Sequence, residues 1–188
     1  MLDFPRPAAG AIFAGVAPRS AGILMYRQSS QAGIEVLLVH PGGPFFARRD
    51  AGVWSIPKGE YAGPEEPLAC ARREFAEETG HELGPGPTIA LGEIRQRGGK
   101  VVTAWALEGD LDADRISSNA FSMEWPPRSG RQEEFPEVDR AGWFGLVQAG
   151  EKILPAQRPL LARLAEALAG DSPPSGGDPR AGGRSARG

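Results

Sequence analysis

One stretch of the chain, from Gly59 to His81, constrains the fold more than any other. It reads GEYAGPEEPLACARREFAEETGH and is rich in glutamate. Because an α-helix advances about 100° per residue, Glu74, Glu77 and Glu78 fall on one face of a helix. Like charges at this spacing repel one another, and a divalent cation such as Mg²⁺, which binds carboxylate oxygens, relieves the repulsion. The spacing therefore predicts a helix with a metal-binding face.

The sequence also marks the two ends of this helix. Glu65 and Glu66 place negative charge at the N-terminus, where the helix dipole favours it, and Pro67 is tolerated in the first turn. Gly80 is a suitable left-handed cap for the C-terminus. An apolar stripe rotated away from the glutamates consists of Leu68, Ala71 and Phe75. One side of the helix is therefore expected to pack on a core while the other faces the metal.

The same segment resembles the signature of the Nudix hydrolases. At the spacing of that signature the chain has Gly59, Glu65, Arg73, Glu74, Phe75, Glu77, Glu78 and Gly80. His81 stands where the signature has a final apolar residue, a position that packs the helix end and carries little chemistry. So many matches at the correct spacing are far more specific than a lone glycine motif. The competing interpretation is a solvated acidic helix, which does not explain why all of these positions match the signature.

The resemblance implies roles for the residues of the segment. Mg²⁺ or Mn²⁺ is expected on Glu74, Glu77 and Glu78, with the carbonyl of Gly59 as a further ligand. Either Glu74 or Glu77 is the expected general base, and the choice stays open. Arg73 is expected to orient the glutamates through a bidentate pair with a second carboxylate, that of Glu65.

The resemblance also implies one ligand from outside the segment, and position on the helix suggests roles for two neighbours within it. Nudix enzymes often recruit one acidic ligand from outside the segment, and Glu137 has the best position, with Glu133 and Glu134 as rivals in the same loop. Cys70 lies one turn before Glu74 and is expected to be a small filler, because a thiol is a poor ligand for a hard cation. Arg72 is expected to be a surface charge.

The residues around the segment suggest the substrate class. The approach WSIPKGEY places Lys58 directly before Gly59, an arrangement similar to that of Nudix enzymes that cleave dinucleoside polyphosphates, where the lysine would contact a phosphate. Arg95 and Lys100 are further candidates for phosphate binding. Phe45 and Phe46 follow a Gly/Pro loop and are candidates for a wall against a base. The combination of HPGGPFF, WSIPKGEY and MEWPPRSG resembles bacterial proteins described as predicted nucleotide pyrophosphohydrolases.

Composition narrows the function classes. The formal net charge of −3 argues against general affinity for nucleic acid, and a capped RNA end is the one nucleic-acid partner left open. A single cysteine fits a reducing compartment, and the expected location is cytoplasmic. No apolar run reaches the ~18 residues of a membrane helix. The run AAGAIFAGVA superficially resembles a signal-peptide core, but Asp3 balances Arg6 before it and Pro18 follows it.

The order of elements predicts an α/β fold, the Nudix-type α/β/α sandwich with a mixed sheet. Strands are expected at AGILMYR, IEVLLVH, VWSIP, TIALGEIRQ, KVVTAWALEGD and GWFGL, and an amphipathic helix over 155–169. Residues 112–138 are expected to form a long, mostly irregular stretch, and the loop from Phe121 to Arg140 is expected to be a lid that carries specificity. The domains are an N-terminal arm (1–18), a Nudix hydrolase domain (19–170) and a disordered tail (171–188).

The expected activity is divalent-metal-dependent hydrolysis of a phosphoanhydride bond in a nucleoside diphosphate linked to another group. Dinucleoside polyphosphates lead, ahead of nucleoside triphosphates and ADP-ribose-like compounds. The alternative is a non-catalytic Nudix-fold module that senses a nucleotide, which usually shows losses among the acidic positions. Here every acidic position is filled. The sequence does not give the oligomeric state.

Overall fold

The computed structural model describes residues 18–30 and 33–170. Apart from Pro18, the predicted N-terminal arm lies outside the described residues, and so does the predicted tail. Short 3₁₀ turns lie at 97–99, 113–115 and 155–157. The strands and helices are β1 (Arg19–Ser29), β2 (Gly33–Pro41), β3 (Lys58–Glu60), α1 (Pro67–Thr79), β4 (Thr88–Arg95), β5 (Val101–Glu108), β6 (Ala120–Glu124), β7 (Gln132–Pro136), β8 (Val138–Gly145), α2 (Leu146–Lys152) and α3 (Arg158–Gly170).

The main sheet is mixed and has six strands in the order β4-β5-β1-β2-β8, with β3 paired to β1 beside this path. β1 and β5 run parallel, and the other neighbours are antiparallel. The short β3 shares one edge of β1 with β2, and its Gly59 lies opposite Ala21. This pairing fixes the start of the glutamate-rich segment against the central strand.

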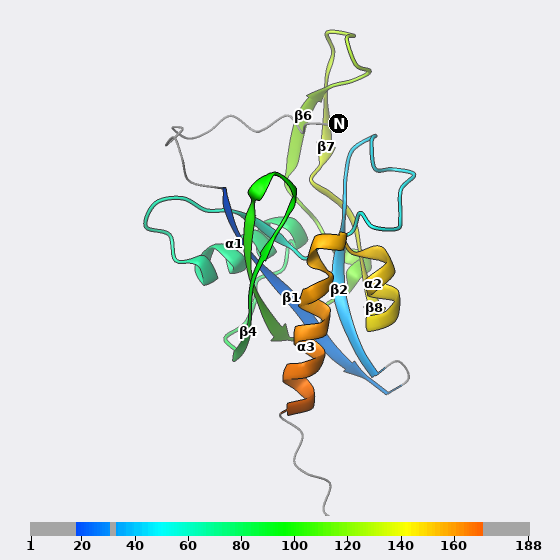
Figure 1. Ribbon diagram of the computed structural model, residues 1–188. Coiled ribbons are helices and arrows are strands. Elements are labelled where there is room, and N and C mark those ends of the chain that lie inside the picture. Colours follow the sequence, from blue (N-terminus) through cyan, green and yellow to red (C-terminus); the bar gives the residue numbers. More distant parts are fainter. Residues whose placement is uncertain (1–17, 31–32, 171–188) are drawn as a thin grey trace, which may run out of the picture.

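Helices cover both faces of the sheet, α1 on one and α2 with α3 on the other (Figure 1). The alternation of side chains along β1 explains how one strand serves both faces. Ile23 and Met25 pack with Phe75 of α1, whereas Leu24 and Tyr26 pack in the cluster that contains the leucines of α3. The predicted α/β/α sandwich with a mixed sheet is therefore confirmed.

Helix α1 begins and ends as the sequence predicted. Pro67 occupies its first turn, and Gly80 closes it in the left-handed region at φ 74°, with its N–H donating to the carbonyl of Ala76. Ala71 and Phe75 of the apolar stripe are fully buried. The glutamates lie on another side of the helix, where Glu74 packs on Gly59 and Glu78 accepts a hydrogen bond from Lys58 N of β3.

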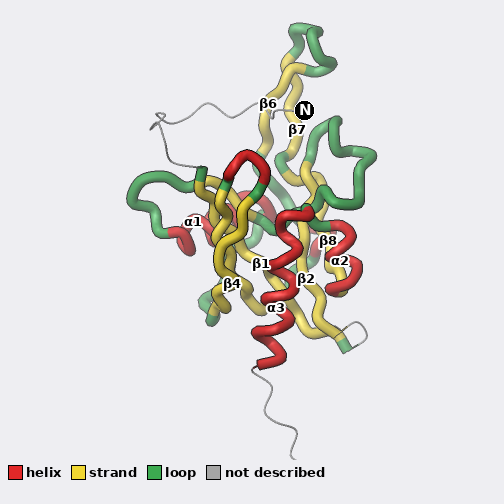
Figure 2. The backbone as a smooth tube through the Cα atoms, in the orientation of Figure 1, coloured by secondary structure: helices red, strands yellow, loops and turns green. Residues whose placement is uncertain are grey.

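The prediction of an irregular loop over 112–138 is wrong. This stretch contains a β-hairpin of β6 and β7, with Phe121 opposite Phe135 and Met123 opposite Glu133. The hairpin projects from the body of the sheet and ends in a loop at its tip (Figure 2). Its strands are short and mostly exposed, so they lack the apolar alternation that marks a strand in sequence.

Three boundaries also differ from the predictions. VWSIP is not a strand, because Trp54 and Ser55 form only isolated bridges and the strand begins at Lys58. The strand predicted at GWFGL begins earlier, at Val138, and α2 follows it without having been predicted. The first residues of the predicted C-terminal helix form a 3₁₀ turn before α3. None of the helices among the described residues is long and apolar enough to cross a membrane.

Candidate active site

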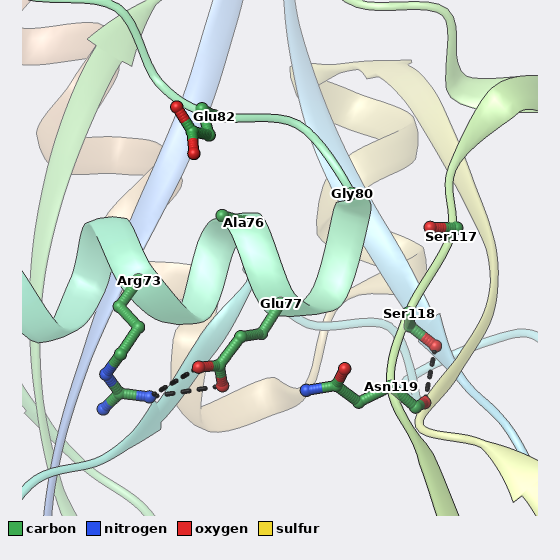
Figure 3. Close-up of a pocket in the computed structure, with 8 residues that line it drawn as sticks. All are labelled: Arg73, Ala76, Glu77, Gly80, Glu82, Ser117, Ser118 and Asn119. Carbon is green, nitrogen blue, oxygen red and sulfur yellow. Dashed lines mark hydrogen bonds and ion pairs between the residues drawn. The ribbon is translucent and has the colours of Figure 1, made fainter.

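The glutamate face of α1 is organised around one guanidinium group. Arg73 Nη1 lies 2.7 Å from Glu74 Oε1 and 3.2 Å from Glu77 Oε2. Figure 3 shows the Arg73 side chain turned along the helix toward the Glu77 carboxylate. The positive charge therefore lies between two of the carboxylates that the sequence places on one face.

The predicted pair of Arg73 with Glu65 is confirmed. Arg73 Nε donates to Glu65 Oε1 at 3.1 Å, and Nη2 donates to Oε2 at 3.3 Å. This bidentate geometry uses the fork of the guanidinium, which a lysine does not have. The hydrogen bonds to Glu65, with those to Glu74, raise the pKa of Arg73 above its usual value, so it remains a cation at every physiological pH.

Glu74 packs directly on Gly59. A Cβ atom at position 59 would overlap the Glu74 carboxylate, so the close approach of strand and helix requires glycine there. Cys70 completes the contact, with Sγ 3.7 Å from the Gly59 carbonyl oxygen. Cys70 is fully buried, and burial raises the pKa of its thiol to about 11, so it is the small filler that was predicted.

Burial acts on two of the carboxylates. Desolvation raises the pKa of Glu74. Desolvation first, and then the charges of Glu74 and Glu137, raise the pKa of Glu78 to about 7. The backbone N–H of Lys58 donates to Glu78 Oε2 at 3.3 Å, and the Lys58 charge opposes both shifts. The site thus concentrates more negative charge than its own cations balance.

Glu137 is tied by its backbone to the C-terminus of α1. Asn119 N donates to the Glu77 carbonyl at 3.2 Å, and Glu137 N donates to the Asn119 carbonyl at 2.8 Å. The carbonyl of Glu137 then accepts from Gly42 N at 2.9 Å. Glu133 and Glu134, the rivals of Glu137, lie on the projecting strand β7.

A cavity of about 480 Å³ opens beside this part of the helix. Figure 3 shows Asn119 reaching toward Glu77 across it. Its wall is formed by Arg73, Ala76, Glu77, Gly80, Glu82, Ser117, Ser118 and Asn119. Residues 117–119 were not predicted as part of the site. They form a short polar segment without periodicity, so the sequence does not indicate that they lie beside the glutamate helix.

The loop that follows β2 is anchored by a buried histidine. His40 Nδ1 lies 2.7 Å from Asp139 Oδ1, and Nε2 lies 2.7 Å from the Arg49 carbonyl oxygen. The ring therefore joins the far end of the loop to β8, two residues beyond Glu137. Neither His40 nor Asp139 was singled out in the sequence, since a lone histidine in an apolar strand reads as core.

The two candidate aromatic residues of this loop differ in placement. The Phe45 side chain is 41% exposed and meets Trp125 of the hairpin edge to face, with ring centroids 5.4 Å apart. Phe46 instead packs against the core cluster on the α3 side of the sheet. Only Phe45 is therefore presented as an open aromatic surface by this loop.

The basic candidates on the β4–β5 pair lie at the end of the sheet next to β3. Lys100 Nζ forms an ion pair with Glu60 Oε1 at 3.0 Å, which partly neutralises it. Arg95 is exposed at the end of β4, opposite Val101. The structure thus brings Lys100 next to the glycine-containing strand and leaves Arg95 at the rim.

The donor atoms fit a divalent cation by their chemistry. The Glu74, Glu77 and Glu78 carboxylates and the Gly59 carbonyl supply only oxygen, the element that Mg²⁺ and Mn²⁺ prefer. Within residues 18–30 and 33–170, however, no three His, Cys, Asp or Glu side chains converge as a finished metal cage. Glu74 and Glu77 are instead each paired with the Arg73 guanidinium.

A family model, the NUDIX domain, matches residues 16–164, which is most of the 188-residue chain. The chain belongs to the Nudix family. No curated protein matches the sequence at a significant level. The family match confirms the prediction made from the glutamate segment, and the protein is a Nudix pyrophosphohydrolase acting on nucleoside diphosphate derivatives.

Solved structures share this Nudix fold at low sequence identity. An Ap4A hydrolase from C. elegans, in a binary complex, gives a TM-score of 0.57 at 22% identity, over 80% of this chain and 98% of that one. The NUDIX domain of Shewanella oneidensis NrtR with ADP ribose gives 0.56 at 17%, over 82% and 90%. A MutT protein from Methanosarcina mazei Go1 gives 0.54 at 20%, over 84% and 99%.

Proposed function

We propose that this Nudix enzyme uses Mg²⁺ or Mn²⁺ to hydrolyse a phosphoanhydride bond in a nucleotide, with dinucleoside polyphosphates as the leading substrates. The observation that carries the proposal is the oxygen-only donor set, in which Glu74 packs on Gly59 and Glu78 is bonded to Lys58 N. A cation held there would neutralise phosphate charge and lower the pKa of the attacking water.

The residues of the chain supply the remaining chemistry. Water attacks phosphorus, the bridging P–O bond breaks, and the leaving phosphate carries away the bonding electron pair. Glu74 or Glu77 accepts the proton of the water. The side chain of Glu77 is 39% exposed and lines the open cavity, whereas that of Glu74 is 15% exposed, which favours Glu77 for contact with water.

Arg73 acts in this proposal by orienting carboxylates. It is bonded to Glu65, Glu74 and Glu77, so its charge is already shared among protein groups. Glu137 is proposed as the acidic ligand from outside the helix, because its charge acts on Glu78 and its backbone is tied to α1 through Asn119.

The preference for dinucleoside polyphosphates rests on the residues at the mouth of the site. Lys58 acts electrostatically on Glu74 and Glu78, so its ammonium is near the proposed metal site, where a polyphosphate chain would run. Phe45 with Trp125 offers an aromatic surface for a base. Lys100 is paired with Glu60 of β3 and Arg95 is exposed at the end of β4, so both are proposed as further phosphate contacts. The similarity to an Ap4A hydrolase supports this ranking, and that to an ADP-ribose complex supports ADP-ribose-like compounds after it.

A substrate panel tests the proposal. Dinucleoside polyphosphates, nucleoside triphosphates, ADP-ribose and capped RNA are incubated with the full chain and Mg²⁺ or Mn²⁺, and the products are separated by chromatography. Metal-dependent cleavage of a dinucleoside polyphosphate at the highest kcat/KM is the expected result. Cleavage of another class alone would contradict the ranking, and no cleavage of any nucleotide would contradict the proposed reaction.

A further inference from the structure

A short segment, residues 117–119, links the glutamate helix to Glu137, which lies between β7 and β8, and to the start of β8. On one side, the backbone N–H groups of Ser117 and Asn119 donate to the Thr79 and Glu77 carbonyls, at 3.1 and 3.2 Å. These carbonyls belong to the last helical turn and have no hydrogen-bond partner within the helix. On the other side, the same segment bonds residues 137 and 138. We call it the 117–119 bracket.

Within the bracket, one side chain makes the link to β8. Val138 N donates to Ser118 Oγ at 3.0 Å, and the Ser118 hydroxyl has the Val138 and Asn119 carbonyls as acceptors, each at 3.0 Å. Val138 is 6% exposed and lies on β8, the strand at one edge of the sheet. A buried main-chain group on an edge strand needs a partner other than a further strand, and Ser118 provides it.

We propose that Ser118 is a positioning residue that sets the Glu137 carboxylate relative to the glutamates of α1. The main-chain bond from Glu137 N to Asn119 O, 2.8 Å long, fixes one side of residue 137. The Ser118 hydroxyl fixes the next residue, Val138, and so restrains the chain on both sides of the Glu137 Cα. Substituting Ser118 removes this restraint without touching a proposed metal ligand.

Few hydrogen bonds separate Glu137 from α1, so one further restraint, from the Ser118 hydroxyl, is enough to fix the orientation of residue 137. From Glu77 through Asn119 to Glu137, the path crosses only two main-chain hydrogen bonds. These two bonds hold residue 137 at a fixed position relative to α1, provided that the start of β8 does not rotate. Groups that orient the ligands of a metal change metal affinity or activity by about 10- to 100-fold when they are removed.

The inference rests on the proposed function, because it concerns how the proposed ligand Glu137 is held. Its test is Mn²⁺ binding by calorimetry, without substrate, in a double-mutant cycle of Ser118→Ala and Glu137→Gln. Ser118→Thr keeps the hydroxyl. Ser117→Ala is the matched control, since it removes a neighbouring hydroxyl that has no hydrogen-bond partner in the described part of the chain.

The expected result is that Ser118→Ala weakens Mn²⁺ binding about tenfold. Ser118→Thr and Ser117→Ala should bind like the wild type, and Ser118→Ala should add nothing once Glu137→Gln is present. If Ser118→Ala does not fold in a thermal scan, Ser118→Cys replaces it, because a thiol fills the same space and bonds weakly.

Two results would overturn the inference. One is wild-type Mn²⁺ affinity in the Ser118 variant, and the other is an equal loss with and without Glu137, which would indicate a general structural role. Absence of Mn²⁺ binding by the wild-type protein would be different, because it contradicts the proposed metal site itself and removes the inference with it.

Discussion

At the scale of single residues, Arg73 is the group on which the site depends. It contacts the carboxylates of Glu65, Glu74 and Glu77 within 3.3 Å. Each of those contacts alone is the kind of exposed ion pair that contributes little to stability. Together they fix the directions in which the carboxylates point, so the consequence of losing Arg73 is expected in catalysis and not in folding.

Arg73→Lys should therefore lower kcat by about 10- to 100-fold while leaving the melting temperature nearly unchanged. A lysine retains the charge but cannot form the bidentate pair with Glu65. The matched control is Arg72→Lys, because among the residues that the structure describes Arg72 bonds only the Gly84 carbonyl, on another side of the helix. Equal rates for the two variants would show that the fork geometry is unimportant.

Gly59 gives a second prediction at this scale. In Gly59→Ala the new methyl group would occupy the place of the Glu74 carboxylate, so that carboxylate must move. Displacing a reacting group by about 1 Å costs on the order of 100-fold in rate, and kcat should fall by that order. Gly84→Ala is the control, because its Cβ would meet no described atom within 4 Å. Full activity in Gly59→Ala would show that the position of the Glu74 carboxylate does not matter for catalysis.

At the scale of elements, helices and strands with one buried face were predictable and the hairpin was not. α1 and α3 carry leucines, alanines and a phenylalanine at helical spacing, and most of them are buried in the structure, with Leu68 and Leu168 partly buried. β6 and β7 bury almost nothing, so their pairing depends on each other and leaves no periodic pattern. α2 has only seven residues, too few for a periodicity to be recognised.

The cap of α1 can be tested by stability. Gly80 adopts φ 74°, where an alanine costs about 1–2 kcal/mol, and its Cβ would lie 2.7 Å from Ser117 Oγ. Gly80→Ala should lower the free energy of unfolding by at least that amount in urea denaturation. Gly150, inside α2, provides a control of opposite sign, since Gly150→Ala should stabilise by about 0.5–1 kcal/mol. A stable Gly80→Ala protein would contradict this cap geometry.

At the scale of the whole molecule, the single cysteine reports on the integrity of the sandwich. Cys70 is fully buried between α1 and the sheet, and burial raises the pKa of its thiol to about 11. At pH 8 the thiol stays protonated and inaccessible, so labelling by a disulfide reagent should be slow in buffer and complete in concentrated urea. Rapid labelling of the folded protein would show that α1 separates from the sheet.

The candidate site shows what a linear sequence can and cannot provide. Glu74, Glu77 and Glu78 were predicted as a group because helical spacing alone brings them to one face. Ser118 and His40 could not be predicted, since their roles arise from contacts with Val138 and Asp139, far away in the chain. Such contacts depend on how strands pair, which a single sequence does not state.

The glutamate face of α1 is proposed to carry metal-dependent hydrolysis. The most direct test is the turnover of a dinucleoside polyphosphate in Mg²⁺ by the wild type, by Glu77→Gln and by Glu82→Gln. Glu82 lines the same cavity but lies beyond the helix, so it is a matched acidic control. We expect turnover to fall at least about 100-fold in Glu77→Gln and to stay unchanged in Glu82→Gln. Near-normal turnover by Glu77→Gln would contradict it.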